Sequence, residues 1–339
     1  MAAWLRRQWV ERGPWAAAMF PLACLYGMVA AWRRRSLVPR AYHNPIPVLV
    51  VGNLTVGGSG KTPLTIWCAE TLLASGLPIA VLASGYGGRL GTGPALVPRQ
   101  GPAHHFGDEA VLLAQRLDCP VIAGRNRRAA LALACSLGAR LAVSDDGLQH
   151  PHWCPDGVLV ACYGPRPFGN GLLLPAGPLR EPLGRLGEAD AILSGGGAAW
   201  AFPSQKPVFH FSIVAEPRAY PLCGGPPVSF ETWRGQMVHA IAGMHEPRRF
   251  FDDLRAFGLE VQEHPFADHH AFGAGDLAGM DDGVVLCTAK DAVKLRPWAD
   301  ARYHEVRAHV AMDPAASGFL VALAARLLNE SARPSCGLE

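Results

Sequence analysis

The sequence predicts an α/β protein whose core is a parallel sheet of the P-loop NTPase type. Three observations carry this prediction. Short apolar runs alternate with helical segments along the first half of the chain, which is typical of βαβ units. A glycine-rich loop follows the first apolar run, and a later run ends in two aspartates. We also expect a second, smaller α/β domain and an N-terminal membrane-associating helix.

Composition excludes several classes of protein. Of the 339 residues, 50% are hydrophobic and 17% are charged, which excludes a disordered chain. The net charge of +3 is too small to indicate a nucleic-acid partner, and none is expected. The 9 cysteines include no C-x-x-C pair, so a zinc ribbon is not expected. No obligate protein partner is predicted.

The predicted core covers residues 41–200. Its first strand is the apolar run at 47–51, and the helix after the glycine-rich loop presents Leu64, Cys68 and Leu72 on one face. Pro63 is tolerated there because it falls in the first helical turn. The remaining strands are expected at 79–83, 121–123, 141–144 and 157–161, with helices at 109–117 and 127–137.

A connector rich in glycine and proline separates the core from a second unit, predicted at 201–339. The connector includes the three glycines at 195–197 and the segment 203–207, so we place the boundary near residue 200. The second unit is expected to contain strands at 238–242 and 284–287, and helices at 247–257 and 315–329.

The N-terminal segment, residues 1–40, raises the question of a membrane. Gly13 to Trp32 is a run of 20 residues without a charge, and arginines flank it on both sides. That length could span a bilayer, but the run is weakly apolar and Pro21 is expected to break or kink the helix. We therefore expect a helix that lies in the membrane surface, with arginines on anionic headgroups. The alternative is a helix packed on the core.

Residues 55–62 match the end of the P-loop pattern G-x-x-x-x-G-K-[ST], although Thr55 stands where glycine is usual. Glycines let backbone N–H groups close around phosphate oxygens. Lys61 would reach the β- and γ-phosphates of ATP, and Thr62 would offer its hydroxyl to Mg²⁺. The alternative is a glycine-rich turn with an unrelated lysine. The expected ATP contacts are Thr55, Val56, Gly57, Gly58, Ser59, Gly60, Lys61 and Thr62.

A second acidic motif follows the apolar run at 141–144. Asp145 and Asp146 come at the carboxyl end of this expected strand, which places their carboxylates beside the phosphate loop. Carboxylates at this position hold the metal in P-loop enzymes, so both residues are candidate Mg²⁺ ligands. The alternative is an Asp-Gly turn after a strand.

Candidates for acid–base chemistry lie outside the loop. Asp108 opens a helix, and its spacing leaves two roles open: a helix cap, or the base that accepts the proton of an acceptor hydroxyl. Asp268 precedes His269 and His270, and an Asp–His hydrogen bond that orients an imidazole is favoured over a metal site. Arg180, in a proline-containing loop, could bind a phosphate.

Together these motifs resemble the tetraacyldisaccharide 4′-kinase family, the lipid A 4′-kinases. The resemblance extends from about Trp15 to Arg296. The matching segments are 51–63, 85–88, 107–109, 145–150, 168–171, 174–182, 240–243 and 268–272. It implies an enzyme of lipid A biosynthesis that uses ATP and Mg²⁺ to phosphorylate the 4′-hydroxyl of an acylated glucosamine disaccharide 1-phosphate, giving lipid IVA. It also implies a place at the cytoplasmic face of the bacterial inner membrane, bound peripherally or monotopically.

The resemblance also implies roles for single residues. Asp108 becomes the catalytic base, with His269 in support and Lys61 as a catalytic residue of the loop. The Mg²⁺ ligands are expected to be Thr62, Asp145 and Asp146. Arg180 and Glu181 become substrate or nucleotide contacts. Tyr86, Glu109 and Arg127 are also expected to contact the substrate, Arg127 because a cation at the start of a helix suggests an anionic ligand or a membrane surface nearby.

Two positions depart from the family pattern. Ser84 stands where arginine is usual, and Ala289 stands where glutamate is usual. Loss of that arginine could weaken a phosphate contact, but neither position alters Lys61 or Asp108, so activity is expected. The alternative function is a soluble P-loop kinase or ATP-dependent ligase acting on a small metabolite. A third hypothesis is a nucleotide-switched binding module without acceptor chemistry.

Overall fold

The structure is a computed structural model, and it describes residues 7–37, 44–57, 60–150, 154–197, 202, 204–244, 246–280 and 282–331. Its central feature is a mixed, mostly parallel sheet, so the predicted α/β class is confirmed. At the middle of the first group of strands lies β1 (Val48–Gly52), between β5 (Leu141–Asp145) and β6 (Gly157–Tyr163). The other strands of this group are β2 (Ile79–Ala83), β3 (Ala95–Leu96), β4 (Val121–Ala123) and β7 (Ala191–Gly195).

The strands β1, β2 and β5 are buried at every position, because helices cover both faces of this part of the sheet. One face packs against α3 (Lys61–Ala74), α5 (Asp108–Arg116) and α9 (Pro314–Ser331). The opposite face packs against α6 (Arg127–Ser136). A short helix, α4 (Ala103–Phe106), precedes α5.

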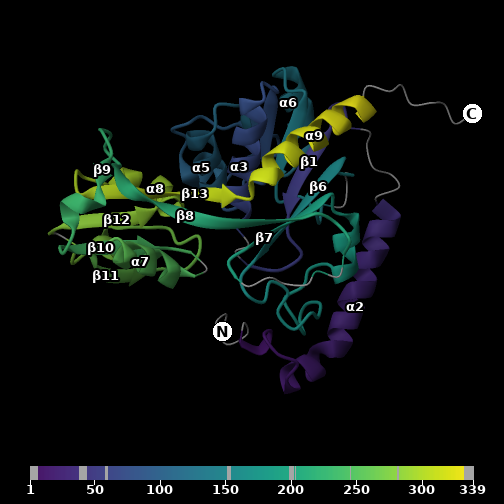
Figure 1. The fold of residues 1–339 in the computed structure, drawn as a ribbon, viewed down its shortest axis with the longest axis horizontal. Coiled ribbons are helices and arrows are strands. Elements are labelled where there is room, and N and C mark those ends of the chain that lie inside the picture. The colour runs from purple at the N-terminus through teal and green to yellow at the C-terminus, as the bar shows by residue number, and fades with distance from the viewer. Residues whose placement is uncertain are drawn as a thin grey trace, which may run out of the picture.

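The second group of strands lies at the other end of the molecule (Figure 1). Its strands are β8 (Val208–Pro221), β9 (Val228–Ser229), β10 (Met237–Ala242), β11 (Glu260–Pro265), β12 (Val284–Thr288) and β13 (Tyr303–Met312). Its helices are α7 (Pro247–Ala256) and α8 (Ala289–Leu295). Short 3₁₀ turns occupy Leu183–Glu188, Phe230–Trp233, Ala274–Leu277 and Arg296–Trp298.

Two long strands join the groups into one sheet. β8 begins parallel to β7 and continues antiparallel to β13, which is itself parallel to β12. The resulting order is β11-β10-β12-β13-β8-β7-β6-β1-β5-β2-β4-β3, with β9 on β8. Figure 1 shows β8 and β13 running from the middle of the molecule into the second group. The domain boundary near residue 200 falls between β7 and β8 and stays a prediction.

The C-terminal helix belongs by its packing to the first group of strands. The helix expected at 315–329 was predicted to belong to the second unit, but Leu320, Leu323 and Leu327 of α9 join the core that contains Leu64 and Leu72 of α3. The long antiparallel strand β13 explains this position, because it returns the chain to the first group before α9 begins.

The N-terminal helix α2 (Pro14–Leu37) lies beside the loops that follow β6 (Figure 1). It continues through Pro21, so this residue does not break the helix. A proline removes one backbone donor, and the other hydrogen bonds of a 24-residue helix remain available. Within the described residues, the stretch Pro14–Ser36 is the one helix long and apolar enough to cross a membrane.

Candidate active site

The phosphate loop connects the buried strand β1 to α3. Gly60 is the residue before α3 and has a φ of 71°, a left-handed conformation that favours glycine. The start of the loop is held by the segment at residues 178–179. The Val56 N–H donates to the Pro178 carbonyl at 2.9 Å, and Thr55 forms a β-bridge with Leu179. Gly58 and Ser59, two of the expected ATP contacts, lie outside the described residues.

Lys61 is the first residue of α3, and two neighbours hold its ammonium group. Nζ donates to Asn53 Oδ1 at 3.1 Å and lies 3.2 Å from Asp146 Oδ2. Asn53 is fully buried directly after β1, so its amide is fixed at the base of the loop. The lysine therefore points toward the end of β5, where the acidic pair stands.

Asp145 and Asp146 lie at the carboxyl end of β5, as the parallel sheet requires. The Thr65 hydroxyl donates to Asp145 Oδ1 at 3.1 Å, and the Thr62 hydroxyl donates to Asp145 Oδ2 at 3.4 Å. Burial raises the pKa of Asp145, and the negative charges of Glu109 and Asp146 raise it further. The ionised form of Asp145 is therefore disfavoured by its surroundings, and a cation bound beside it would favour that form.

Two arginines surround the acidic pair. The Arg180 guanidinium donates to the Thr55 carbonyl at 3.0 Å and to Asn53 Oδ1, and it lies 3.5 Å from Asp146 Oδ2. Arg127 is buried, and it donates to the Asp146 carbonyl at 3.0 Å. Arg127 thus supports the backbone of the acidic pair, whereas Arg180 stands at the phosphate loop itself.

Asp108 and His269 form an ion pair between segments far apart in the sequence. His269 Nδ1 lies 3.0 Å from Asp108 Oδ2 and 3.2 Å from Oδ1. His269 follows β11 in a loop and has a φ of 61°, a left-handed conformation that is uncommon outside glycine. The expected Asp–His hydrogen bond is therefore made with Asp108, while Asp268 Oδ1 lies 3.8 Å from the other ring nitrogen.

Charge compensation sets the protonation of this pair. Burial raises the pKa of Asp108, but the hydrogen bond with His269 and the charge of Lys290 outweigh it, so the net shift is downward. The same hydrogen bond raises the pKa of His269. Both shifts favour the charged forms: the Asp108 carboxylate stays ionised to lower pH than an ordinary aspartate, and the His269 imidazole keeps its proton to higher pH than an ordinary histidine.

Lys290 completes this cluster from the start of α8. Its Nζ lies 2.9 Å from Asp268 Oδ1, 3.3 Å from Glu109 Oε1 and 3.3 Å from His269 Nε2. Burial lowers the pKa of Lys290, but the charges of Glu109, Asp108 and Asp268 raise it by more. The ammonium thus links the two acids that open α5 to the histidine loop.

The other predicted contacts are more peripheral. Tyr86 is 64% exposed, and its ring meets that of His269 edge-on with the centroids 5.2 Å apart. Glu181 follows Arg180, and its Oε2 lies 3.8 Å from Arg185 Nε. Tyr86 therefore borders the Asp108–His269 pair, and Glu181 borders the phosphate loop.

Sequence reasoning did not assign roles to Asn53, Gln149 or Lys290. Asn53 receives Lys61 and Arg180 on its side-chain oxygen, and Gln149 donates to its backbone carbonyl at 2.8 Å. One signal was available for Lys290: the chain has four lysines among its many arginines, and Lys61 and Lys290 both lie in this site.

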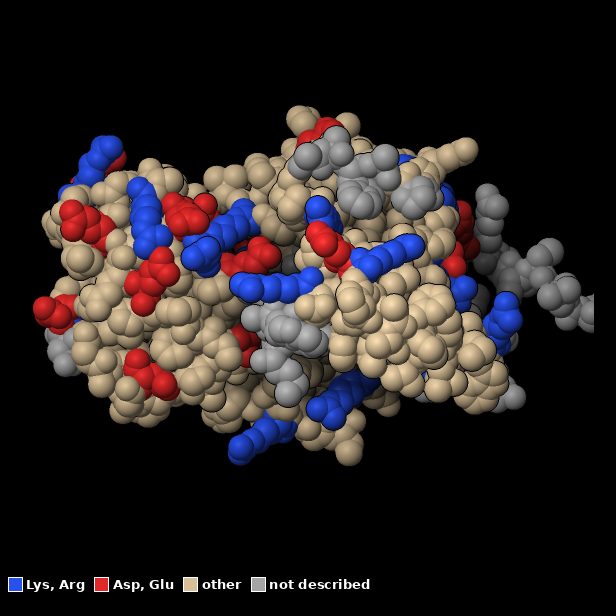
Figure 2. Space-filling view, turned by 90° about the horizontal axis from the view of Figure 1, so that it is seen from below, with Lys and Arg blue, Asp and Glu red and all other residues tan. Residues whose placement is uncertain are grey.

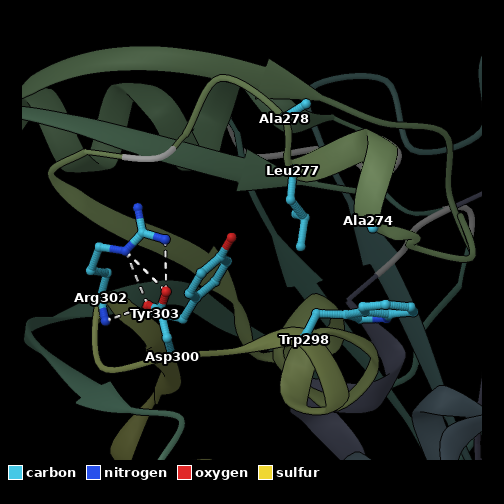
Figure 3. A pocket seen from close by; sticks show the side chains of 7 residues that line it. All are labelled: Ala274, Leu277, Ala278, Trp298, Asp300, Arg302 and Tyr303. Atoms are coloured by element: carbon cyan, nitrogen blue, oxygen red, sulfur yellow. Dashed lines mark hydrogen bonds and ion pairs between the residues drawn. The ribbon is translucent and has the colours of Figure 1, made fainter.

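A separate cavity of about 380 Å³ lies in the second group of strands (Figure 3). None of its lining residues is one of the site residues above, and the Arg302 guanidinium that lines it is paired with Asp300, with one nitrogen 2.7 Å from Oδ2. Its lining residues are Ala274, Leu277, Ala278, Trp298, Asp300, Arg302 and Tyr303.

The Asp108–His269 pair predicts a pH-dependent contribution to folding. Because the folded pKa of His269 is raised, its contribution is fully present below the unfolded value of about 6.5 and is lost as the pH rises through the folded pKa. The folded pKa of Asp108 is lowered, so the stability that Asp108 contributes is lost only at acidic pH, as the pH falls through that pKa. We therefore expect His269→Gln to reduce the free energy of unfolding, measured with urea, more at pH 6 than at pH 9.

The control is the same substitution in an Asp108→Asn background, where the difference between the two pH values should largely disappear. An equal loss of stability at pH 6 and pH 9 in the original background would contradict the assignment.

Comparison with known proteins adds an independent observation. The family model described as Tetraacyldisaccharide-1-P 4′-kinase matches residues 15–327. A tetraacyldisaccharide 4′-kinase from Alkalilimnicola ehrlichii is 43% identical over 324 residues, which cover 94% of this chain and 96% of the relative. Another from Halorhodospira halophila is 42% identical over 328 residues, with 94% and 97% covered. The crystal structure of the "apo" form of LpxK from Aquifex aeolicus in complex with ATP superposes with a TM-score of 0.77 at 26% identity, and the match covers 92% of this chain and 99% of that one.

Proposed function

Because this chain belongs to the tetraacyldisaccharide 4′-kinase family, we propose that it transfers the γ-phosphate of ATP to the 4′-hydroxyl of an acylated glucosamine disaccharide 1-phosphate, with Asp108 as the base. One observation carries the residue assignment: the Asp108–His269 pair stands at the start of α5, and the next residue of that helix, Glu109, acts by its charge on Asp145 at the phosphate site. Glu109, adjacent to Asp108, is close enough to raise the pKa of Asp145 by its charge. The acid–base pair and the phosphate site therefore lie within electrostatic range of each other.

The residues present suit a bound Mg²⁺. The Thr62 hydroxyl and the carboxylates of Asp145 and Asp146 are oxygen donors, which this hard cation prefers. Asp146 Oδ1 is buried and, within the described part of the chain, accepts no hydrogen bond. These residues would hold the ion beside the phosphate loop, where it would supply positive charge to the phosphates of ATP.

The side chains divide the work of the transfer. Asp108 is ionised at neutral pH and accepts the proton of the 4′-hydroxyl. As this proton is transferred, the 4′-oxygen forms a bond to the γ-phosphorus, and the bond between that phosphorus and ADP breaks. His269 holds this carboxylate in place through its Nδ1. Lys61 and Arg180 place positive charge where negative charge grows on the transferred group and on the leaving phosphate.

An exposed apolar helix suits a lipid acceptor. Only 11% of the apolar stretch of α2 is buried, and its exposed side chains include Phe20, Leu22, Leu25, Met28, Val29 and Trp32. Figure 2 shows the face that carries α2, where an area free of charged side chains is bordered by Lys and Arg. The opposite side of the helix contacts the protein, with Ala16 and Ala23 buried. The proposal therefore has α2 lying in the cytoplasmic surface of the inner membrane, where it meets the lipid substrate.

This placement of α2 predicts how the chain partitions. We expect the wild type to sediment with anionic vesicles and to be released by detergent or high salt. Replacing both Leu25 and Met28 with aspartate should lower the vesicle partition coefficient at least about tenfold, since each apolar side chain contributes about 1.5–3 kcal/mol on burial. Leu137→Asp, at an exposed position after α6, is the control and should sediment like the wild type. A wild-type chain that stays in the supernatant at low salt without detergent would contradict the interfacial helix.

The transfer itself is tested with radiolabelled ATP, Mg²⁺ and purified tetraacyldisaccharide 1-phosphate in detergent. The expected result is a labelled lipid that requires both the enzyme and the 4′-hydroxyl, so an acceptor blocked at this position remains unlabelled. Such a result would also show that Ser84 and Ala289 are tolerated. Folded, ATP-binding enzyme that labels a soluble metabolite instead would overturn the proposal.

A further inference from the structure

The loop of residues 170–180 lies between the N-terminal segment and the phosphate loop. On its outer side, the Trp9 indole donates to the Pro175 carbonyl at 2.9 Å, and the Trp9 carbonyl accepts from the Asn170 N–H at 2.7 Å. Arg12 Nε donates to the Asn170 carbonyl at 3.2 Å. The chain that leads into α2 is thus attached to the 170–180 loop by main-chain and side-chain hydrogen bonds.

α2 itself contacts the same loop at two adjacent residues. The Tyr26 hydroxyl donates to the Arg180 carbonyl at 3.0 Å. Next to it, Gly27 approaches Leu173 so closely that a Cβ at this position would lie 2.8 Å from Leu173 Cδ1. The side of α2 that carries Tyr26 and Gly27 is therefore fitted to the 170–180 loop, although much of the helix is exposed.

The inner side of the 170–180 loop is paired with the phosphate loop. The Arg180 N–H donates to the Leu54 carbonyl at 2.7 Å, and the Pro178 carbonyl accepts from the Val56 N–H at 2.9 Å. The Arg180 side chain then reaches Thr55 and Asp146. Arg180 is therefore bound on both sides: its carbonyl accepts a hydrogen bond from α2, and its guanidinium lies at the proposed nucleotide site.

We propose that Tyr26 is a positioning residue for ATP binding, acting through Arg180. Its hydroxyl fixes the main chain of Arg180 from the side of α2, and this fixes where the guanidinium meets the phosphate loop. The inference rests on the proposed nucleotide site. It gives α2 a second role beside contact with lipid, because a residue of this helix then increases the affinity for ATP.

The test is ATP–Mg²⁺ binding to the full-length protein in detergent micelles, measured by calorimetry, together with steady-state kinetics. Loss of one hydrogen bond predicts that Tyr26→Phe raises the Kd and the KM for ATP by about threefold to tenfold, with kcat within about twofold. Tyr220→Phe is the matched control, because it removes a tyrosine hydroxyl that bonds Glu216 on β8 at 2.7 Å. Its Kd for ATP should equal that of the wild type. Equal Kd values for Tyr26→Phe and the wild type would overturn the proposal.

A double-mutant cycle separates positioning from a general loss of structure. If Tyr26 acts through Arg180, Tyr26→Phe should have no further effect on ATP affinity in an Arg180→Ala background. Fully additive effects would overturn the proposal. The Lys61→Ala variant tests the proposed nucleotide site separately from the role of Tyr26. If this variant binds ATP as tightly as the wild type, the assignment of the nucleotide site is wrong. If Lys61→Ala loses affinity and Tyr26→Phe does not, only the role of Tyr26 is wrong.

Discussion

Replacing Asp108 with asparagine is expected to lower kcat by about a hundredfold to a thousandfold. The amide keeps the size of the carboxylate but cannot accept the proton of the 4′-hydroxyl. ATP binding should change little, because Asp108 contacts His269 and the backbone of Glu109, while Lys61 and Arg180 hold the phosphate site. Steady-state phosphotransfer and ATP calorimetry on the same preparation measure both quantities.

The matched control is Asp118→Asn, an exposed aspartate just beyond the far end of α5 that pairs with Arg99. It should leave kcat unchanged. His269→Gln should reduce kcat by less than Asp108→Asn, because it removes the support of the base and not the base itself. Normal turnover by Asp108→Asn would remove Asp108 from the chemistry and leave it a helix-terminal acid.

Replacing Lys61 with alanine is expected to lower kcat/KM for ATP by about a hundredfold to a thousandfold or more. Two losses combine in this variant. The ammonium that would neutralise the β- and γ-phosphates is gone, and Asp146 loses the nearer of two positive partners, since Lys61 Nζ lies 3.2 Å and Arg180 3.5 Å from its Oδ2. Unlike Asp108→Asn, this variant should bind ATP measurably more weakly in the calorimeter.

Two further variants sharpen the Lys61 result. Lys61→Arg should also be impaired, because a planar guanidinium does not replace a compact ammonium between Asn53 and Asp146. Lys206→Ala, which removes a lysine from the segment before β8, should have the kinetics of the wild type. If Lys61→Ala retained wild-type kcat/KM, the glycine-rich segment would be a structural turn and the nucleotide would bind elsewhere.

Local sequence patterns were enough to predict several elements of the fold and of the site. Short apolar runs predicted the strands at 79–83 and 121–123 with the bounds that the structure has, because each run is long enough to fill one buried strand. The glycine loop followed by Lys61, and the aspartates at the end of β5, were recognisable because parallel strands place such residues at one edge. The exposed apolar residues of α2 were likewise visible as an uncharged run.

The way in which these elements are joined depends on contacts between distant segments, which local patterns do not encode. The partly exposed strands β8 and β13 lack a uniform apolar run, so local periodicity did not reveal that they connect both groups of strands. The same strands return α9 to the first core, although its position in the sequence suggested the second unit. A strand whose burial depends on its neighbours carries little local signal of its own.

The partners within the site were also decided by the fold. Asp108 and His269 are 161 positions apart, and Tyr26 and Arg180 are 154 apart, so no pattern of spacing could pair them. Asn53 and Lys290 gained their roles in the same way, from the charges that packing brought to them. Local sequence specifies which side chains can do chemistry, but a contact between distant segments depends on the packing of the whole sheet and its helices, which sets the distances between them.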